Sequence, residues 1–265
     1  MRIIDSLDFI DTVENGVFVT HEKSDKRYPL HQHQKGQLTY VEGGITYVTV
    51  DNITYVVPAR YFFWIPSGVP HILKLSHSAT VLRSLYFYTN DDDKSPFYNE
   101  LGIYAASDLV IEMIAYTERW HDLMVDPQTP NFEFLQALKN ILPSSINKNM
   151  QLQLPISDNP RMVKITDYLD IHFGKQLTLA DISDKFNLSE RSVSRLFQAE
   201  LQVPFLQYLK ALRIVKAIEL LMKTEQSISE IANTVGYVTL GSFSNAFREF
   251  TGIRPLEMRN KREGK

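Results

Sequence analysis

The sequence predicts a multidomain α+β protein, in which a β-rich N-terminal domain with flanking helices precedes an all-helical C-terminal domain. Residues from about Leu38 to Tyr88 are rich in Val, Ile, Thr, Tyr and Phe in short runs separated by turn residues, which is typical of strands. Beyond Pro160, apolar residues recur three and four positions apart, which is typical of amphipathic helices. A polar segment with three prolines, Pro143 to Pro160, lies between the two patterns and indicates a linker.

The composition is that of a packed globular protein. The chain has 265 residues, of which 44% are hydrophobic and 22% charged, and this length suits one large domain or two ordinary ones. The absence of cysteine excludes disulfides and leaves His, Asp, Glu and Gln as the side chains that could hold a metal ion. The N-terminus lacks the apolar core of a signal peptide, and no run approaches the roughly 20 apolar residues that span a bilayer. We therefore expect a cytoplasmic protein.

The N-terminal domain is predicted to be a small antiparallel barrel or sandwich, because its candidate strands are short and evenly spaced. The strands are expected in the runs GQLTYVEGG (36–44), ITYVTVDN (45–52), ITYVVPA (53–59), YFFWIPSG (61–68) and TVLRSLYFYTN (80–90). Gly43-Gly44 and Asp51-Asn52 are the expected hairpin corners, since these residue types tolerate the positive φ that tight hairpins require.

Two helices are predicted after Asn99, over Ser107–Trp120 and Thr129–Leu142, with Ser107 and Thr129 as N-caps. They could close the barrel or pair with a second copy of the chain. We place the first domain at residues 1–146, the linker at 147–160 and the second domain at 161–265. The net charge of −3 divides unevenly, as −7 before Arg161 and +4 from Arg161 onward, which suits a C-terminal domain that meets a polyanion.

The C-terminal domain contains an internal repeat. Three apolar residues recur 49 positions later, and three more recur 50 positions later: Leu179, Ile182 and Phe186 match Ile228, Ile231 and Val235, and Val193, Phe197 and Val203 match Phe243, Phe247 and Ile253. Each copy is predicted to hold a short helix, a turn at Asn187 or Gly236, and a second helix. An amphipathic helix from about Phe205 to Lys223 joins the copies.

A helix, a tight turn and a second amphipathic helix form the layout that places a recognition helix in the DNA major groove. Ser189 and Thr239 are the expected N-caps of the second helices. The residues expected to face inward are Val193, Leu196 and Phe197 in the first copy and Phe243, Ala246 and Phe247 in the second. Those expected to face outward are Arg191, Ser192, Ser194, Arg195 and Gln198, and Gly241, Ser242, Ser244, Asn245 and Arg248.

The outward set has the chemistry of a reading surface, because Arg can bond guanine in bidentate fashion, Asn can bond adenine, and Gly241 allows close approach of the backbone. The alternative is that both copies are ordinary packing units whose polar faces meet solvent. Two copies at matching spacing, joined by one amphipathic helix, favour DNA binding.

The last hundred residues resemble the AraC-type transcription regulators. The resemblance rests on LADISDKFNLSERSVSRLF, YLKALRIVKAIELL and, most specifically, SISEIANTVGYVTLGSFSNAFREFTGIRPLEMR. It implies that two helix-turn-helix units, bridged by a long helix, enter successive major-groove segments about 34 Å apart on one face of the duplex. It also implies that the protein regulates transcription, and we expect it to activate. The expected partners are promoter DNA and RNA polymerase, and the expected assembly is a homodimer.

Carried over position by position, the resemblance implies a set of DNA-binding residues: Arg191, Ser192, Ser194 and Arg195 in the first unit, and Leu240, Gly241, Ser244 and Asn245 in the second. The chain departs from the family at three positions. Asn187 replaces the usual turn glycine, Phe205 stands where proline is frequent, and Asn245 replaces a frequent arginine. The last change indicates weaker binding by the second unit, or a different base preference.

The N-terminal domain groups three histidines. PLHQHQKGQLTY places His31 and His33 two apart, which in a strand puts both on one face, and PSGVPH ends in His71. His21, His77, His121 and His172 have no such grouping, and we expect each to be exposed or hydrogen-bonded.

The grouping resembles the cupin barrel that serves as sensor domain in many regulators of this family. The resemblance implies effector binding by His31, His33, Gln37 and His71 at the barrel mouth. Metal-binding cupins carry a glutamate where this chain has Gln37, and an amide is a poorer ligand than a carboxylate. We therefore expect no cofactor, although three imidazoles could still hold Zn, Ni, Cu or Fe.

Three functions follow from these patterns. The leading hypothesis is a sequence-specific DNA-binding regulator whose cupin-like domain senses a small molecule, without enzymatic activity. The second is a metal-dependent cupin enzyme with an appended DNA-binding domain, which near-stoichiometric metal and turnover of a substrate would favour. The third is a constitutive regulator that uses its pocket region only for dimerisation.

Overall fold

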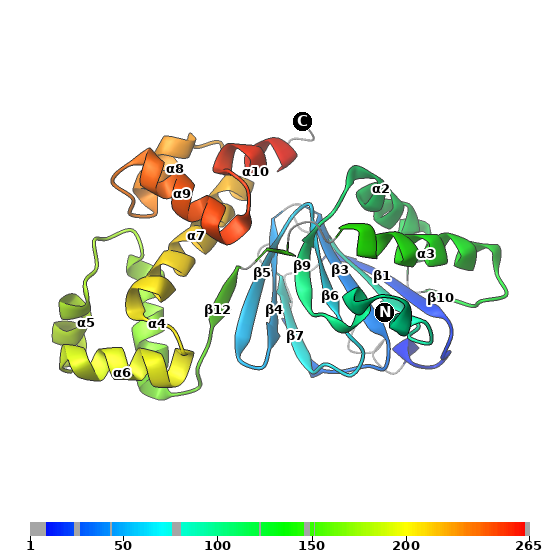
Figure 1. Cartoon of the computed structure of the whole chain (residues 1–265), viewed down its shortest axis with the longest axis horizontal. Coiled ribbons are helices and arrows are strands. Elements are labelled where there is room, and N and C mark those ends of the chain that lie inside the picture. Colours follow the sequence, from blue (N-terminus) through cyan, green and yellow to red (C-terminus); the bar gives the residue numbers. More distant parts are fainter. Residues whose placement is uncertain are drawn as a thin grey trace. The chain divides into compact units, whose positions relative to one another are not determined.

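A computed structural model of the chain describes residues 9–23, 27–42, 44–75, 81–121, 123–145, 149–150 and 152–262 (Figure 1). It divides into two compact units, one of residues 1–51 and 57–151 and the other of residues 52–56 and 152–265. No helix in the described ranges is long and apolar enough to cross a membrane. The first unit is rich in strands and the second is helical, which confirms the predicted fold class.

Two antiparallel sheets build the N-terminal part of the chain. Its strands are β1 (Val17–Lys23), β2 (Arg27–His31), β3 (Gly36–Glu42), β4 (Ile45–Val50), β5 (Ile53–Pro58), β6 (Tyr61–Ile65), β7 (His71–Leu75), β8 (Val81–Phe87), β9 (Gly102–Ala105), β10 (Leu123–Val125), β11 (Asn149–Met150) and β12 (Gln153–Pro155). The strand order is β10-β1-β8-β3-β6-β9-β11 in one sheet and β12-β5-β4-β7-β2 in the other.

The two predicted hairpin corners have different outcomes. Asp51 and Asn52 both have positive φ, 48° and 62°, and they join β4 to β5 as predicted. The prediction at Gly43-Gly44 is wrong for a hairpin, because β3 and β4 lie in different sheets. Gly44, with φ 81°, instead lies where the chain passes from one sheet to the other, and Gly43 lies outside the described residues.

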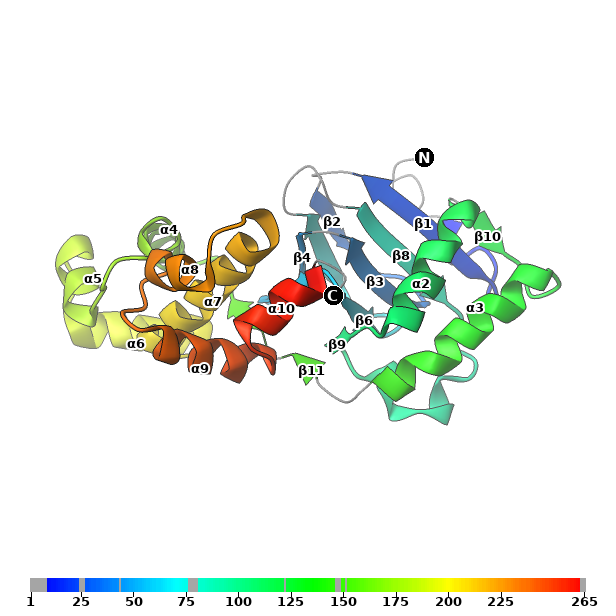
Figure 2. The ribbon, with the colours of Figure 1, turned by 90° about the horizontal axis from the view of Figure 1, so that it is seen from above.

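The predicted helices after Asn99 are α2 (Asp108–Tyr116), continued by a 3-10 turn (Thr117–Trp120), and α3 (Pro130–Ile141). Ser107 caps α2 by accepting from the Val110 amide at 3.3 Å, whereas Thr129 precedes α3 without a side-chain capping bond. Both helices pack on the seven-stranded sheet (Figures 1 and 2). The shared core contains Leu38, Trp64 and Leu85 from the sheet with Ile114 and Leu135 from the helices.

The other face of the same strands is partly polar. Along β3, Leu38 and Tyr40 belong to the core beneath the helices, so the alternation of side chains turns Gln37 and Thr39 towards the other sheet. Both of these side chains are fully buried. The segment predicted as the linker contains two paired strands, since β11 pairs with β9 and β12 pairs with β5.

The C-terminal unit contains seven helices within the described residues. They are α4 (Pro160–His172), α5 (Leu179–Phe186), α6 (Glu190–Leu201), α7 (Phe205–Lys223), α8 (Ile228–Thr234), α9 (Leu240–Thr251) and α10 (Pro255–Arg262). The helix α7 has the bounds predicted from the sequence. Figures 1 and 2 show α5 and α6 near one end of α7 and α8 and α9 near the other, so that one helix joins both repeats.

Candidate effector site and nucleic-acid interface

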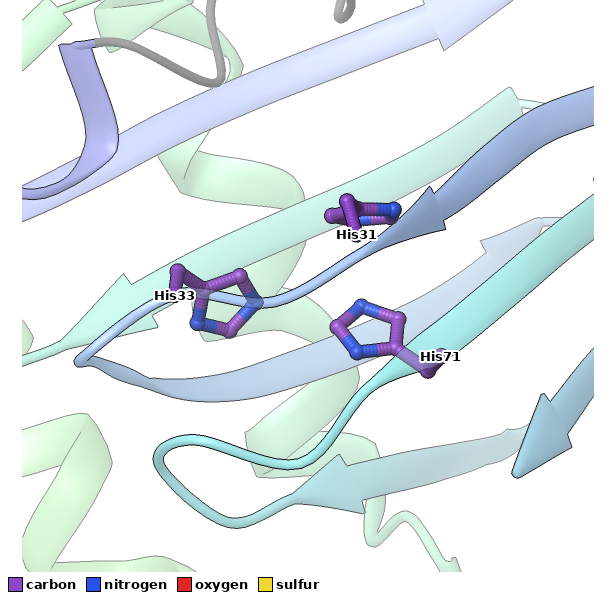
Figure 3. Close-up of side chains that lie close together, drawn as sticks. All are labelled: His31, His33 and His71. Carbon is purple, nitrogen blue, oxygen red and sulfur yellow. The ribbon is translucent and has the colours of Figure 1, made fainter. Parts of the chain in front are cut away.

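Strand pairing brings the three histidines of the N-terminal unit together. His31 ends β2 and lies directly opposite His71 at the start of β7, with ring centroids 4.2 Å apart. His33 lies beyond the end of β2, and its ring is 5.2 Å from that of His71 (Figure 3). The prediction that His31 and His33 lie on one face of the same strand is therefore wrong, because His33 is outside the strand. The two residues nevertheless join one cluster.

Backbone carbonyls fix the tautomer of all three rings. The Nδ1 atoms of His31, His33 and His71 lie 2.8, 2.7 and 2.8 Å from the carbonyl oxygens of Pro29, Lys35 and Val69. A carbonyl oxygen can only accept, so each Nδ1 carries the proton and each Nε2 is left with a lone pair. The cluster thus presents three acceptors.

Two of these acceptors have no hydrogen-bond partner among the residues that the structure describes. The Nε2 atoms of His31 and His71 are buried without a hydrogen bond, a condition that costs about 1–3 kcal/mol for each group. The Nε2 of His33 lies 3.0 Å from Gln37 Oε1, which is also an acceptor and so does not satisfy it in this tautomer. Buried polar groups are normally satisfied, so this concentration of unpaired acceptors makes the cluster a candidate binding site.

Gln37 connects the cluster to the seven-stranded sheet. Its amide nitrogen donates to Thr39 Oγ1 at 2.8 Å and to Ser84 Oγ at 3.4 Å, and all three side chains are buried. His33 also packs edge-on against Tyr86, with ring centroids 4.9 Å apart. Because β2 and β7 belong to the other sheet, the site lies between the two sheets.

Burial also keeps the histidines neutral. It lowers the pKa of His31 and His33 and lowers that of His71 to about 3, and for His31 and His71 the neighbouring imidazoles add to this effect. At neutral pH the cluster is therefore an uncharged set of lone pairs, as metal binding or hydrogen bonding to a donor ligand requires. One ring nitrogen from each histidine lies within 4.8 Å of the others, so the residues fit a metal ion.

Lysine 35 fixes the loop before β1. Its ammonium group donates to the carbonyls of Val13, Glu14 and Gly16 at 2.7, 3.0 and 2.8 Å. Burial lowers the pKa of Lys35 to about 8. This residue separates His33 from Gln37 in the sequence, so its anchoring holds the two site residues in place.

Two histidines that the sequence left ungrouped also form a cluster, on the helix-covered face of the seven-stranded sheet. The His21 amide donates to His121 Nδ1 at 2.9 Å, and the His21 ring contacts Thr117 and Arg83. Arg83 in turn donates to Glu42 and Glu118 at 2.6 and 3.2 Å. His21 has its partners 62 to 100 positions away in sequence, and local patterns carry no signal of them. His77 lies outside the described residues.

The first helix-turn-helix unit comprises α5 and α6. A capping box of Thr178 and Asp181 starts α5, and Asn187 ends it in the left-handed conformation, with φ 51° and ψ 48°. Ser189 then caps α6 by accepting from the Ser192 amide at 3.1 Å, as predicted. Val193 and Phe197 are fully buried, and Leu196 is half-buried.

The second unit repeats this construction with α8 and α9. A capping box of Ser227 and Glu230 starts α8, Gly236 makes the turn with φ 87°, and Thr239 caps α9 by accepting from the Ser242 amide at 3.2 Å. A side chain at Gly236 would lie within 3.0 Å of Arg213 and of a backbone oxygen, so glycine is required there. Neither capping box is among the predicted caps, although T-x-x-D and S-x-x-E at matching positions signal them.

The DNA-binding residues predicted for the two units lie at the surface. Seven of the eight are exposed and Ser244 is half-buried: Arg191, Ser192, Ser194 and Arg195 on α6, and Leu240, Gly241, Ser244 and Asn245 on α9. Neither Arg191 nor Arg195 forms an ion pair within the described residues. The Ser192 hydroxyl already has a hydrogen-bond partner, since it lies 2.9 Å from the hydroxyl of Ser189. Val238, which the predicted set omits, is 81% exposed beside the start of α9.

These features define a class of protein. Two capped helix-turn-helix units with exposed polar helices are built for DNA, and a buried polar site between two sheets is built for a ligand. Comparison with known families supports both halves: residues 182–261 match the helix-turn-helix domain, and residues 15–91 match the AraC-like ligand binding domain. The chain belongs to the AraC family of transcription regulators, which is not a family of enzymes.

Relatives with similar sequences are also regulators. The chain is 29% identical over 243 residues to the HTH-type transcriptional regulator NimR of Escherichia coli, covering 90% of this chain and 85% of that protein. It is 23% identical over 277 residues to the HTH-type transcriptional activator RhaS of Citrobacter koseri, with 99% of each chain covered. Among solved structures, the C-terminal domain of AraT, a response regulator from Geobacillus stearothermophilus, is 36% identical and covers 39% of this chain and 86% of that one, with a TM-score of 0.38.

Proposed function

We propose that this protein is a transcription activator controlled by a small-molecule effector. Residues 1–146 form the cupin-like sensor and dimerisation domain, 147–160 the linker, and 161–265 the DNA-binding domain. The observation that carries the effector role is the cluster of polar side chains between the two sheets, in which two buried ring nitrogens lack a hydrogen-bond partner among the described residues. We assign effector binding to His31, His33, Gln37 and His71.

We assign DNA binding to Arg191, Ser192, Ser194 and Arg195 in the first unit and to Leu240, Gly241, Ser244 and Asn245 in the second. The exposed residues of α6 and α9 support this assignment, as do Arg191 and Arg195, whose guanidinium groups form no ion pair with any described residue. Leu240 is 47% exposed, and an exposed apolar side chain at the start of a recognition helix suits contact with a thymine methyl group.

The mechanism is coupling between two sites. Effector binding changes the orientation or freedom of the DNA-binding domain and so its affinity for promoter DNA, where the bound protein acts on RNA polymerase. Leu109 and Tyr116 on α2 are 58% and 45% exposed, and exposed apolar side chains on this helix suit a homodimer contact. Since its target is chromosomal DNA, we place the protein in the cytoplasm.

The test of DNA binding starts with genome-wide mapping of bound sites, followed by affinity measurements on a mapped site and on unrelated duplex. Replacing Arg195 with Ala should weaken specific binding roughly 5- to 150-fold, the effect of losing about 1–3 kcal/mol of base discrimination, and should weaken nonspecific binding much less. Lys164→Ala removes an exposed cation that lies outside both helix-turn-helix units, and this variant is the matched control. Equal losses on both duplexes would reduce Arg195 to a phosphate contact.

Salt dependence provides an independent measure. The logarithm of the affinity should fall linearly with the logarithm of the salt concentration, with a slope of about −0.9 for each phosphate contacted. A protein with no preference for any duplex at low salt would contradict the DNA-binding function. Equal promoter occupancy with and without every candidate metabolite would contradict the effector role and favour a constitutive regulator.

A further inference from the structure

We propose that His31, His33 and His71 bind one divalent transition-metal ion of the zinc, cobalt, nickel or copper type through their Nε2 atoms. Gln37 Oε1 supplies a fourth ligand. The inference rests on the proposed function in one respect, because it takes the effector site as its location and makes the ion the effector or part of it.

The hydrogen bonds around the rings are those of a metal site. Imidazoles that ligate a metal almost always donate their other ring N–H to a carbonyl or carboxylate, which fixes the tautomer and aims the free nitrogen. Here all three Nδ1 atoms lie within 2.8 Å of a backbone carbonyl. His31 and His71 use the carbonyl two residues earlier in the chain, Pro29 and Val69, so the same local device orients both rings.

The spacing of the ligand atoms fits one ion. Zinc–nitrogen bonds of about 2.0–2.1 Å place the nitrogens of a tetrahedral site about 3.3 Å apart, and those of neighbouring octahedral positions about 3 Å apart. The three histidines already hold one nitrogen each within 4.8 Å of the others. Gln37 Oε1 lies 3.0 Å from His33 Nε2, the separation expected of two adjacent ligands.

Gln37 directs its oxygen to the cluster. Its amide nitrogen donates to Thr39 Oγ1 and Ser84 Oγ, which leaves Oε1 facing His33 Nε2 at 3.0 Å. The amide oxygen and the imidazole lone pair are both acceptors and cannot bond to each other. A metal ion between them would take both lone pairs.

The ligand chemistry selects the class of ion. Imidazole suits zinc, copper, nickel and iron, whereas calcium and magnesium require carboxylate-rich oxygen sites. Three imidazoles and an amide leave both charges of the ion without a neutralising protein ligand. The bound ion therefore attracts an anion from solution, such as hydroxide or a carboxylate, into its remaining coordination position.

The experiment uses the full-length chain after treatment with a chelator, with zinc or cobalt ions alone as the probe. We expect one equivalent of zinc per chain by calorimetry, with a dissociation constant below about 1 μM. Cobalt should give visible absorption bands of a nitrogen-ligated site, which zinc then abolishes. Absence of saturable binding at 10-fold excess of either ion would overturn the proposal.

Variants test the assignment of the ligands. Both His71→Ala and His31→Ala should weaken zinc binding by more than the roughly 10–100-fold that loss of an outer-shell partner causes. His31 is the less buried of the two, so His31→Ala guards against a folding defect in the other variant. His172→Ala, in a helix of the other unit, should leave binding unchanged. Unchanged binding in His31→Ala and His71→Ala would overturn the proposal.

Gln37→Glu supplies a test in the opposite direction. A carboxylate at this position neutralises part of the charge of the ion, so zinc should bind at least about 10-fold more tightly and should raise the melting temperature more than in the unmodified protein. An equal or weaker affinity would remove Gln37 from the ligand set.

The effector role is tested apart from metal binding, by titrating promoter DNA with the metal-loaded and the metal-free protein. A change in DNA affinity that disappears in His71→Ala supports the role, and equal affinities would overturn it. Zinc binding is measured without DNA, so failure of the DNA-binding function and failure of the metal site give different results.

Discussion

The buried ammonium group of Lys139 provides a direct test of the N-terminal fold. Lys139 lies on α3 with a fully buried side chain, and it donates to the Tyr88 carbonyl at 2.6 Å, to Asp92 at 2.8 Å and to Asp91. It also lies 4.8 Å from the centre of the Tyr98 ring. One cation therefore joins α3 to the segment that follows β8.

Replacing Lys139 with Met keeps the length of the side chain but removes the buried cation from two carboxylates that are only 10% and 13% exposed. Removal of one partner from a buried ion pair costs about 3–5 kcal/mol of the free energy of unfolding. Lys94 is the matched control, since it pairs with Asp91 at 3.3 Å but is 69% exposed. Lys94→Met should cost about 0–1 kcal/mol.

Tryptophan fluorescence during urea unfolding measures these effects selectively. The chain has two tryptophans, Trp64 and Trp120, and both lie buried in the N-terminal unit. Trp64 also donates from its indole nitrogen to the Tyr98 carbonyl at 2.9 Å, close to the Lys139 cluster. The fluorescence transition thus reports on the unit that contains the substitution. A shift in midpoint with unchanged slope would give the change in stability.

The pH dependence provides a second check. Burial raises the pKa of Asp91, but the hydrogen bonds and charges of Lys139 and Lys94 together outweigh burial and hold this pKa below its usual value. For Asp92, burial prevails and raises the pKa. In Lys139→Met both carboxyls lose this partner, so their folded pKa values rise and the folded variant binds protons more readily than the unfolded chain. Its deficit should therefore shrink as pH falls from 7 towards about 4. If Lys139→Met and Lys94→Met lost free energy of unfolding to within about 1 kcal/mol of each other at pH 7, the reasoning would be refuted.

Three further predictions concern the turn, a close contact and a buried histidine. Asn187→Ala should cost about 1–2 kcal/mol because φ is 51° there, while Asn187→Gly should be close to neutral, as thermal melts followed by circular dichroism would show. Gly36→Ala should cost about 1–3 kcal/mol in the fluorescence assay, because the added carbon would lie 2.5 Å from the Trp64 ring. Burial lowers the pKa of His21 to about 4, so this residue favours the folded state above pH 6.5 and loses that contribution as pH falls towards 4. His21→Gln should therefore flatten the stability profile in that window, and an unchanged slope would contradict the assignment.

The helical domain could be predicted closely because its signals are local. Helix α7 begins directly after Pro204 and ends directly before Thr224. The residues that cap α6 and α9 lie three positions before the amides to which they bond. Periodicity and capping therefore fix these helices before any tertiary contact is known.

The effector site could be predicted only in part, because it depends on pairing between distant strands. The sequence identifies His31 and His71, but their approach requires that β2 pair with β7, and nothing local indicates this register. Lys139 follows Leu138 on a helix and reads as a surface residue, since its partners Asp91 and Asp92 are 48 and 47 positions away. The short strands β11 and β12 are missed for the same reason.

The single helix α7 connects the two helix-turn-helix units and so sets their separation and relative rotation. Phe205 and Tyr208, near its start, pack against Phe197 of the first unit, and α7 also contacts α8 and α9 of the second. Deleting one residue would turn one unit relative to the other by about 100° and shift it by about 1.5 Å, whereas one added base pair rotates the contacted segments by about 35°. Since neither change compensates the other, we expect that operators contacted by both units can vary in base identity but not in the spacing between the two contacted segments.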